Sequence, residues 1–166
     1  MSLFIIHSSA DENLIKNICI QTSDYQYCTN LYFSDNRSYR VGVQGLALIA
    51  IQATINKAQD TIYSRFPELS KKITDLVGKQ RLGVCKTDYT NSENNFNGAF
   101  QSTSKSDYWK AIDWIRKGAN DVIDCQDIYK RENPIADSPI SDVNNEIALK
   151  LSGIILACID NLLRRS

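Results

Sequence analysis

The sequence contains very little histidine, proline and glycine. Its 166 residues include one His, three Pro and seven Gly. An all-β protein needs many turns rich in Gly and Pro, so this scarcity favours long helices joined by few connections. The one histidine is His7, in a segment that we exclude from the fold below, which leaves no base for a Ser-His-Asp or Cys-His catalytic pair.

Other features of reactive sites are missing as well. Zinc sites built on His are excluded, and no Cys-x-x-Cys pair supplies a cysteine-based alternative. There is no Gly-rich loop of the kind that binds phosphate. Asp121 and Asp124 lie close to Cys125 and are candidates for an acidic pair, but a catalytic carboxylate needs a cleft, which a helical face need not provide. We therefore expect a protein that is not an enzyme and that uses no metal or cofactor.

The chain also lacks an excess of charge of either sign. Nineteen basic and 19 acidic residues give a formal net charge of zero, whereas a nucleic-acid-binding protein would need a clear basic excess. No apolar run approaches the roughly 20 residues of a membrane-spanning helix. We expect no nucleic-acid or membrane partner, and the length fits one domain with a real hydrophobic core.

The first ten residues, MSLFIIHSSA, place small residues after a short apolar patch. This order is typical of the end of a secretory signal and its cleavage region. Because the apolar part is too short for a complete signal, we interpret residues 1–10 as a signal-peptide remnant or a tag and expect them to be disordered.

From Asp11 onward, apolar residues recur at helical spacing almost throughout. Two short helices are expected over 11–18 and 24–33, followed by an exposed polar turn at 34–38. Four longer apolar stripes follow, over 43–62, 82–99, 111–129 and 143–162. Pro67 should end the first long helix or force a break in it.

Four apolar stripes joined by short connections predict an all-α fold, an antiparallel four-helix bundle preceded by an N-terminal helical hairpin. The expected domain covers residues 11–166, with the hairpin at 11–38 and the bundle at 39–166. Residues on the stripes are expected to pack in the core.

The five cysteines are the most informative residues of the chain. Cys19 and Cys28 flank the turn of the expected hairpin, where a disulfide would tie together an element too small to be stable alone. Cys85 and Cys125 lie at similar heights on the second and third long helices, at about 1.5 Å of rise per residue from the turn that joins them, so a bridge there is geometrically reasonable. Cys158 lies on an apolar stripe and is expected to be a buried free thiol.

The alternative is a cytosolic protein with five buried thiols. Two features argue against it, the signal-like start and the sequon Asn36-Arg37-Ser38 in the expected exposed turn. A sequon of this kind makes Asn36 a candidate site of N-glycosylation and favours a secreted protein.

Several short motifs follow one another along the chain. They are Leu14-Ile15-Lys16-x-x-Cys19, Thr22-x-x-Tyr25-x-x-Cys28, Ser34-Asp35-x-Arg37-Ser38, Val43-Gln44-Gly45-Leu46-Ala47-Leu48-Ile49, Cys85-x-x-x-Tyr89, Asp107-Tyr108 with Trp114-Ile115 and Cys125, and Ser138-Pro139-Ile140 with Asn144-Asn145-Glu146 and Leu151-Ser152. In this order and with these cysteine spacings, the set resembles the plant invertase and pectin methylesterase inhibitors, a family that includes some pollen allergens. The resemblance covers nearly the whole chain after Asp11.

The resemblance implies a four-helix bundle with an N-terminal hairpin and the disulfides Cys19–Cys28 and Cys85–Cys125. It also implies a secreted protein of the cell wall (the apoplast) or the vacuole. Such a protein inhibits pectin methylesterase or acid invertase by forming a 1:1 complex that covers the enzyme's substrate cleft, without a cofactor.

Pectin methylesterase is the favoured target. One group of invertase inhibitors carries Pro-Lys-Phe at the turn where this chain has residues 105–110, and that motif is absent here, while Trp114 is more typical of pectin methylesterase inhibitors. Against this, Lys117-Gly118 and Asn120 stand where those inhibitors usually have Ala-Ala and Thr. The block at 138–145 also resembles that of members named as invertase inhibitors. Two other functional classes are alternatives. One is a non-inhibitory, allergen-like bundle that carries a lipid or nothing, and the other is a helical enzyme.

The partner is expected to contact the exposed face of the second and third long helices and the turn between them. Aromatic residues at a protein surface are frequent interface anchors, and Trp109 is the best candidate. The candidate contact residues are Lys105, Asp107, Tyr108, Trp109, Lys110, Asn120 and Asp121. For Tyr108 and Trp114, packing over the bundle core is the competing interpretation.

Overall fold

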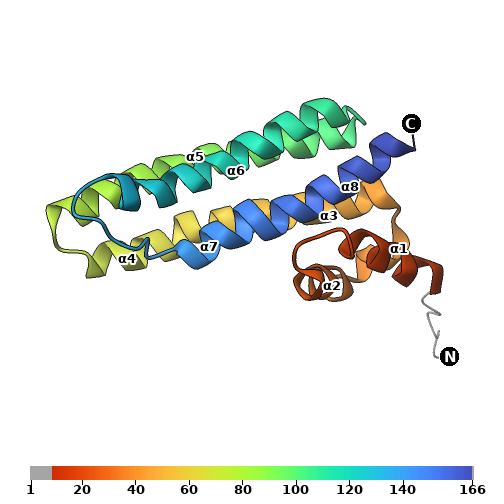
Figure 1. Ribbon diagram of the computed structural model, residues 1–166, viewed down its shortest axis with the longest axis horizontal. Helices are drawn as coiled ribbons and strands as arrows, with labels where there is room; N and C mark the ends of the chain where they lie inside the picture. Colours follow the sequence, from red (N-terminus) through yellow and green to blue (C-terminus); the bar gives the residue numbers. More distant parts are fainter. Residues whose placement is uncertain (1–8, 166) are drawn as a thin grey trace.

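The computed structural model of the protein describes residues 9–165, which form helices and loops but no strand (Figure 1). In chain order the elements are α1 (Ser9–Cys19), α2 (Tyr25–Phe33), the 3₁₀-helix η1 (Asn36–Arg40), α3 (Val43–Asp60), the π-helix η2 (Thr61–Arg65), α4 (Phe66–Lys72), α5 (Leu76–Ser104), α6 (Tyr108–Arg131), α7 (Ser141–Asn145), the π-helix η3 (Glu146–Leu151) and α8 (Ser152–Arg164). The expected all-α fold is thus confirmed.

Four antiparallel rods build the bundle. The first runs through α3, η2 and α4, the second and third are α5 and α6, and the fourth runs through α7, η3 and α8. In Figure 1, α5 and α6 lie side by side in one layer, and α3 lies beside α7 and α8 in the other. Contacts of α3 with α5 and of α6 with α8 hold the two layers together. This arrangement is the predicted four-helix bundle.

Aspartates fix where three of the helices begin. The side chains of Asp24, Asp75 and Asp107 accept hydrogen bonds from the backbone N–H groups of the first turns of α2, α5 and α6. Helix α1 begins at Ser9, two residues before the expected start at Asp11. Residues 1–8 of the expected disordered segment lie outside the described part of the chain.

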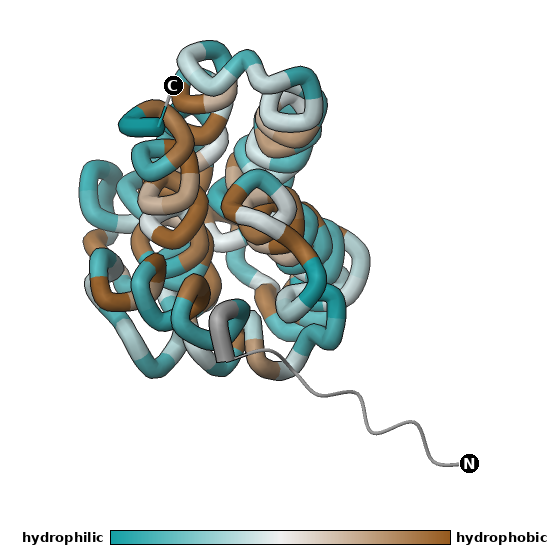
Figure 2. The backbone as a smooth tube through the Cα atoms, turned by 90° about the vertical axis from the view of Figure 1, so that its right-hand side faces the viewer, coloured by the Kyte–Doolittle hydropathy of each residue, from teal (hydrophilic) through white to brown (hydrophobic). Residues whose placement is uncertain are grey.

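The hydrophobic core lies between the two layers. The end-on view of Figure 2 shows hydrophobic positions on the sides of the helices that face one another. Two buried tyrosines bring hydrogen bonds into this core. The hydroxyl of Tyr89 donates to Asn144 Oδ1 at 2.5 Å, and that of Tyr32 donates to the carbonyl of Leu46 at 3.0 Å. Such pairs fix how the helices are placed along their axes, because a shifted helix would leave a buried polar group without a partner.

The first rod continues through Pro67, which we expected to end or break it. The chain widens into the π-helix η2 just before the proline, and the N–H of Phe66 bonds to the carbonyl of Thr61. Pro67 then occupies the first turn of α4, where the missing N–H of a proline costs little. The rod changes its helical pitch here instead of stopping.

Both predicted disulfides are present. The Cα atoms of Cys19 and Cys28 lie 5.4 Å apart, and those of Cys85 and Cys125 lie 4.6 Å apart. Each bridge contributes roughly 2–4 kcal/mol, chiefly by restricting the unfolded chain. Cys158 is the buried free thiol that the sequence indicated, and burial raises its pKa to about 12.

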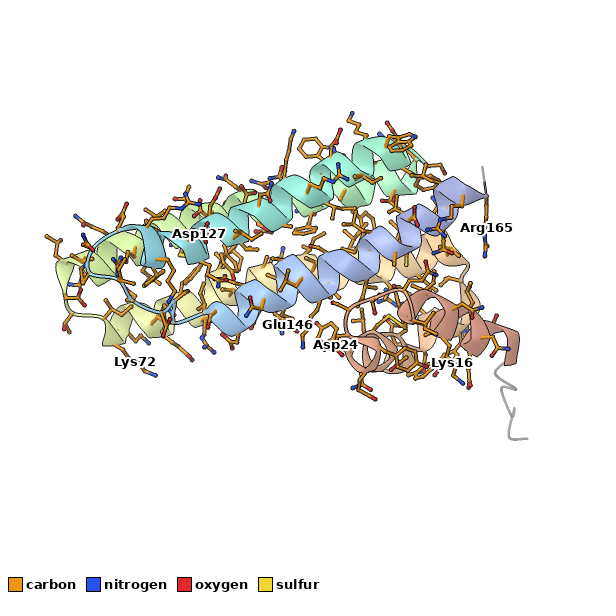
Figure 3. All side chains as sticks on the ribbon, in the orientation of Figure 1. Lys16, Asp24, Lys72, Asp127, Glu146 and Arg165 are labelled. Atoms are coloured by element: carbon orange, nitrogen blue, oxygen red, sulfur yellow. A yellow bond between two sulfur atoms is a disulfide. The ribbon has the colours of Figure 1, made fainter. Side chains whose placement is uncertain are left out.

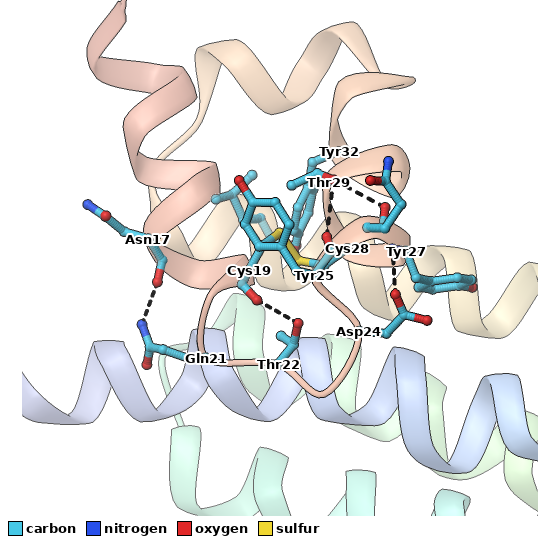
Figure 4. Close-up of a disulfide and its surroundings, with 12 residues drawn as sticks. Asn17, Cys19, Gln21, Thr22, Asp24, Tyr25, Tyr27, Cys28, Thr29 and Tyr32 are labelled. Carbon is cyan, nitrogen blue, oxygen red and sulfur yellow. Dashed lines mark hydrogen bonds between the residues drawn. A yellow bond between two sulfur atoms is a disulfide. The ribbon is translucent and has the colours of Figure 1, made fainter.

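The first disulfide closes the α1–α2 hairpin, which packs against α8, η1 and η3 (Figure 4). Polar contacts join the hairpin to the bundle where Asp24 and Glu146 lie in Figure 3. Tyr27 donates to Glu146 at 2.7 Å, and Asp24 pairs with Lys150 at 2.9 Å. In Figure 1 the hairpin lies on the side of the α3–α8 layer that faces away from α5 and α6.

The disulfides and the buried thiol predict a specific pattern of thiol reactivity. Denatured protein should titrate one thiol without reductant and five after reduction, because four of the five cysteines are bridged. Native protein should show no fast-reacting thiol, because Cys158 is buried and its thiolate is disfavoured. Five thiols in unreduced, denatured protein would contradict both bridges.

Two helical glycines should respond in opposite ways to alanine. A Cβ at Gly118 would lie 2.7 Å from the buried ring of Phe96, so we expect Gly118→Ala to lower the free energy of unfolding by about 1–3 kcal/mol. A Cβ at Gly83 would meet no atom within 4 Å, so Gly83→Ala should gain roughly 0.5–1 kcal/mol from helix propensity alone. Urea unfolding of both variants gives the comparison, and a stabilised Gly118→Ala protein would show that α5 and α6 are farther apart than described.

Candidate protein-binding site

The turn between α5 and α6 has one defined backbone shape. Helix α5 ends at Ser104, and the N–H groups of Ser106 and Asp107 bond back to the carbonyls of Thr103 and Ser102 at 3.0 and 2.9 Å. This pair of bonds is the Schellman ending of a helix. A Schellman ending requires one residue in the left-handed conformation, and here that residue is Ser106, with φ of 60°. This conformation costs a non-glycine residue about 1–2 kcal/mol.

The first rod of the bundle supports this turn from below. At the start of α3, the side-chain amide of Gln44 donates to the carbonyl of Thr103 at 2.7 Å. Thr103 is itself buried. The turn is therefore anchored to a third helix as well as to the two that it joins, and the side chains on it have a fixed base.

The predicted contact residues at the turn fall into two groups. Lys105, Asp107 and Lys110 line a shallow pocket of about 140 Å³. Trp109 lies outside that pocket, and 72% of its surface is exposed. Tyr108 is half-buried and packs against the hydrophobic core. Trp109 is thus the one large aromatic side chain of the turn that a partner can reach without any rearrangement.

Trp114 forms the wall of the same pocket, a role that the sequence did not indicate. Its indole ring lies over Gly98 of α5, where a Cβ would come within 2.8 Å of the ring. Lys117 places its ammonium group 4.9 Å from the centre of the ring. The ring therefore packs α6 against α5 and also lines the pocket.

Asn120 and Asp121 lie farther along α6. Eleven residues separate Lys110 from Asp121, which is roughly 16 Å of helix. Asn120 is exposed, and Asp121 accepts a hydrogen bond of 2.7 Å from Asn95 of α5. The spacing of Lys110, Trp114, Lys117 and Asp121 places them in one row along the side of α6, so the turn and the middle of the helix belong to one continuous face.

An acidic cluster lies in the middle of this face. The sequence indicated a pair, Asp121 and Asp124, and the structure adds Asp88 from α5. Burial, together with the charges of Asp124 and Asp121, raises the pKa of Asp88 to about 6. Burial also raises the pKa of Asp121, against the opposing effect of the hydrogen bond from Asn95.

Asp88 was missed because its position depends on how two helices are placed against each other. A signal was nonetheless available. Asp88 follows Cys85 by three residues, and Asp121 precedes Cys125 by four, so antiparallel helices joined by that disulfide bring the two carboxylates together.

Within the described residues, no group of His, Cys, Asp and Glu is arranged to hold a metal ion. No helix in the same range is long and apolar enough to cross a membrane.

The arrangement suits recognition of another protein. It combines an exposed tryptophan, flanking charges and a shallow pocket on two helices that a disulfide and a fixed turn hold rigid. Interfaces are typically built from such aromatic anchors surrounded by a polar rim.

Comparison with known proteins gives a consistent result. A sequence model described as "Plant invertase/pectin methylesterase inhibitor" matches residues 13–158. "Pectinesterase inhibitor 5" of Arabidopsis thaliana is 31% identical over 150 residues, which cover 89% of this chain and 82% of that protein. "Putative invertase inhibitor" of Platanus orientalis is 23% identical over 156 residues, covering 93% of this chain and 90% of that protein.

Two solved structures share the fold. The crystal structure of a mutant form of a pectin methylesterase inhibitor from Arabidopsis matches with a TM-score of 0.72 at 20% identity, covering 88% of this chain and 95% of that one. A crystal structure of a pectin methylesterase inhibitor from Arabidopsis thaliana matches with a TM-score of 0.64 at 21% identity, covering 90% of this chain and 96% of that one.

The acidic cluster predicts a pH-dependent gain in stability for Asp88→Asn. The folded-state pKa of Asp88 is raised to about 6 from 3.8, so its ionisation destabilises the folded protein increasingly as the pH rises from 4 to 6. Because Asp88 is only partly buried, solvent screening should limit the penalty to about 1 kcal/mol. We expect the variant to melt about 2–4 °C higher than the parent at pH 7 and at the same temperature at pH 3.5.

The exposed Asp113 of α6 provides the matched control. Asp113→Asn should shift the melting temperature little at either pH. An equal gain for Asp88→Asn at both pH values would contradict charge repulsion as its cause.

Proposed function

Since the chain belongs to the plant invertase/pectin methylesterase inhibitor family, we propose that it inhibits a pectin methylesterase by forming a 1:1 complex that covers the enzyme's substrate cleft. The family consists of inhibitors of these enzymes and not of enzymes. The observation that carries the choice of surface is Trp109, a large aromatic side chain left 72% exposed on a turn of fixed shape.

The proposed contact begins at the turn and extends along α6. Trp109 would insert into the partner and bury most of its exposed area, which for a tryptophan is a large apolar contribution. Lys105, Asp107 and Lys110 would form the charged rim around it, and Asn120 and Asp121 would meet the partner farther along the face. Because the turn is already ordered, little conformational entropy is lost on binding.

Inhibition of this kind works by occlusion, so potency depends on the association equilibrium and not on turnover. The rim carries charged side chains that are exposed in the free protein. Such charges mainly affect the association rate, so inhibition should depend on salt concentration.

Pectin methylesterase is supported as the target by the 31% identity to the pectinesterase inhibitor. The absence of the Pro-Lys-Phe motif at the turn supports it as well. Acid invertase is the second candidate, favoured by the likeness to the Platanus orientalis protein named "Putative invertase inhibitor" and by the block at 138–145.

The proposed location is the cell wall, with the vacuole as the alternative. Two disulfides in so small a protein favour an oxidising compartment, since thiols stay reduced in the cytosol. Passage through the secretory pathway is therefore part of the proposal.

A double variant tests the surface. Trp109→Ala/Lys110→Ala should weaken inhibition at least tenfold, because an anchor tryptophan typically contributes more than 2 kcal/mol to binding, while the melting temperature stays nearly unchanged. Tyr63→Ala is the matched control, since Tyr63 is equally exposed, at 72%, but belongs to η2.

The measurement is a titration of the parent and both variants against a plant pectin methylesterase and, separately, against an acid invertase. Near-stoichiometric inhibition of the pectin methylesterase alone supports the proposal. Inhibition of the invertase alone would show that acid invertase is the target instead. Full inhibition by Trp109→Ala/Lys110→Ala would show that the turn is not part of the interface. If the parent protein inhibits neither enzyme, the remaining interpretation is the non-inhibitory, allergen-like bundle.

A further inference from the structure

The tripeptide Asn-x-Ser/Thr occurs once in the sequence, as Asn36-Arg37-Ser38. In the folded protein Asn36 is the exposed first residue of η1, the short connection between the hairpin and α3. We propose that Asn36 carries an N-linked glycan and that the first sugar of this glycan lies in the groove between η1 and α3. The inference rests on the passage through the secretory pathway proposed above, and it is independent of inhibition.

The modification is a balanced transfer to the Asn36 side chain. The amide nitrogen Nδ2 forms a bond to C1 of the first N-acetylglucosamine of an oligosaccharide linked to a lipid pyrophosphate. The C1–O bond to the pyrophosphate breaks, the amide loses one proton, and the lipid pyrophosphate is the leaving group.

The transfer must occur before the chain folds. Ser38, the third residue of the sequon, is only 1% exposed, and its hydroxyl makes no hydrogen bond in the folded protein. A transferase that reads this hydroxyl can therefore reach it only in the unfolded chain. The disulfides require an oxidising compartment, and N-glycosylation takes place on chains entering that same compartment.

The groove beside Asn36 has the chemistry that a sugar requires. Its volume is about 440 Å³, and its walls come from α2, η1 and α3. Gln52 and Asn56 form the α3 wall, and the amide of Gln52 donates to the Asn56 oxygen at 2.9 Å. Ile49 and Ala53 add apolar surface next to these two amides.

A sugar presents hydroxyl groups at its edge and carbon at its face, and this mixture of amides and small apolar side chains matches both. On the opposite wall, Asp35 holds the guanidinium of Arg37 in place with bonds of 2.6–3.2 Å. The protein's own contacts therefore hold this wall in place, without help from the sugar. None of the lining residues comes from α5 or α6, so a glycan seated in the groove leaves the proposed binding face open.

Occupancy is tested by secreting the chain behind an unrelated signal peptide from a host that adds high-mannose glycans. Mass analysis of the peptide containing Asn36 should show the added oligosaccharide, and Asn36→Gln should abolish it. The unrelated signal guarantees entry into the pathway, so an unmodified secreted protein overturns the assigned site whatever the natural location is.

Placement in the groove is tested after endoglycosidase H has trimmed the glycan to a single N-acetylglucosamine. The trimmed protein should melt about 2 °C or more above Asn36→Gln. This gain should disappear in the Gln52→Ala/Asn56→Ala background. It should persist in Gln26→Ala/Asn30→Ala, which removes a similar amide pair, bonded at 3.0 Å, from the exposed surface of α2.

A missing gain, or a gain that survives Gln52→Ala/Asn56→Ala, overturns the placement of the sugar. The Asn36→Gln protein should still inhibit the target enzyme. If no form inhibits while the glycan and its thermal gain are present, the proposed function fails and this inference stands.

Discussion

The close approach of α5 to α6 is the constraint on which the other features depend. Gly118 lets the ring of Phe96 pack against the backbone of α6, and the Ser92 hydroxyl bonds to the Gly118 carbonyl at 2.7 Å. The disulfide Cys85–Cys125 fits between the helices only because their backbones are this near. The same proximity crowds Asp88 against Asp121 and Asp124, so the face that we assign to binding contains electrostatic repulsion that the core does not. The close approach of the two helices therefore explains both the rigidity of the α5–α6 pair and the repulsion among its aspartates.

The hairpin is attached to the bundle by a different kind of contact. Buried Tyr32 links α2 to the Leu46 carbonyl and lies 3.4 Å from the Cys158 sulfur, while Tyr27 bonds to Glu146, which pairs with Lys57 at 3.3 Å. Both hydroxyls are protonated donors at physiological pH, and burial raises the pKa of each tyrosine further above its usual value. The hairpin therefore supports the α3–α8 layer, while the α5–α6 layer is left free to meet a partner.

Much of the fold follows from local patterns. Apolar spacing and capping aspartates locate the helices, and the family resemblance supplies the disulfides that the structure contains. The α-helical pattern is interrupted just before Pro67, as expected, but the form of the interruption, a π-helix that lets the rod continue, is not encoded in helix propensity. Asp88 and the Gly98–Trp114 contact were missed because they depend on the rotation and height of two helices relative to each other. Periodicity determines which side of a helix is apolar, but not which neighbouring residue it meets.

The placement of the cysteines has a consequence for oxidative folding. Each disulfide joins residues within a single helical hairpin, at sequence separations of 9 and 40, so each correct pair can meet before the rest of the chain is assembled. The fifth thiol, Cys158, is buried in the folded protein, where the Tyr32 hydroxyl of the hairpin lies 3.4 Å from its sulfur. Because exchange needs a thiolate that can reach a disulfide, burial and the raised pKa of Cys158 protect both bridges from this thiol once the protein is folded.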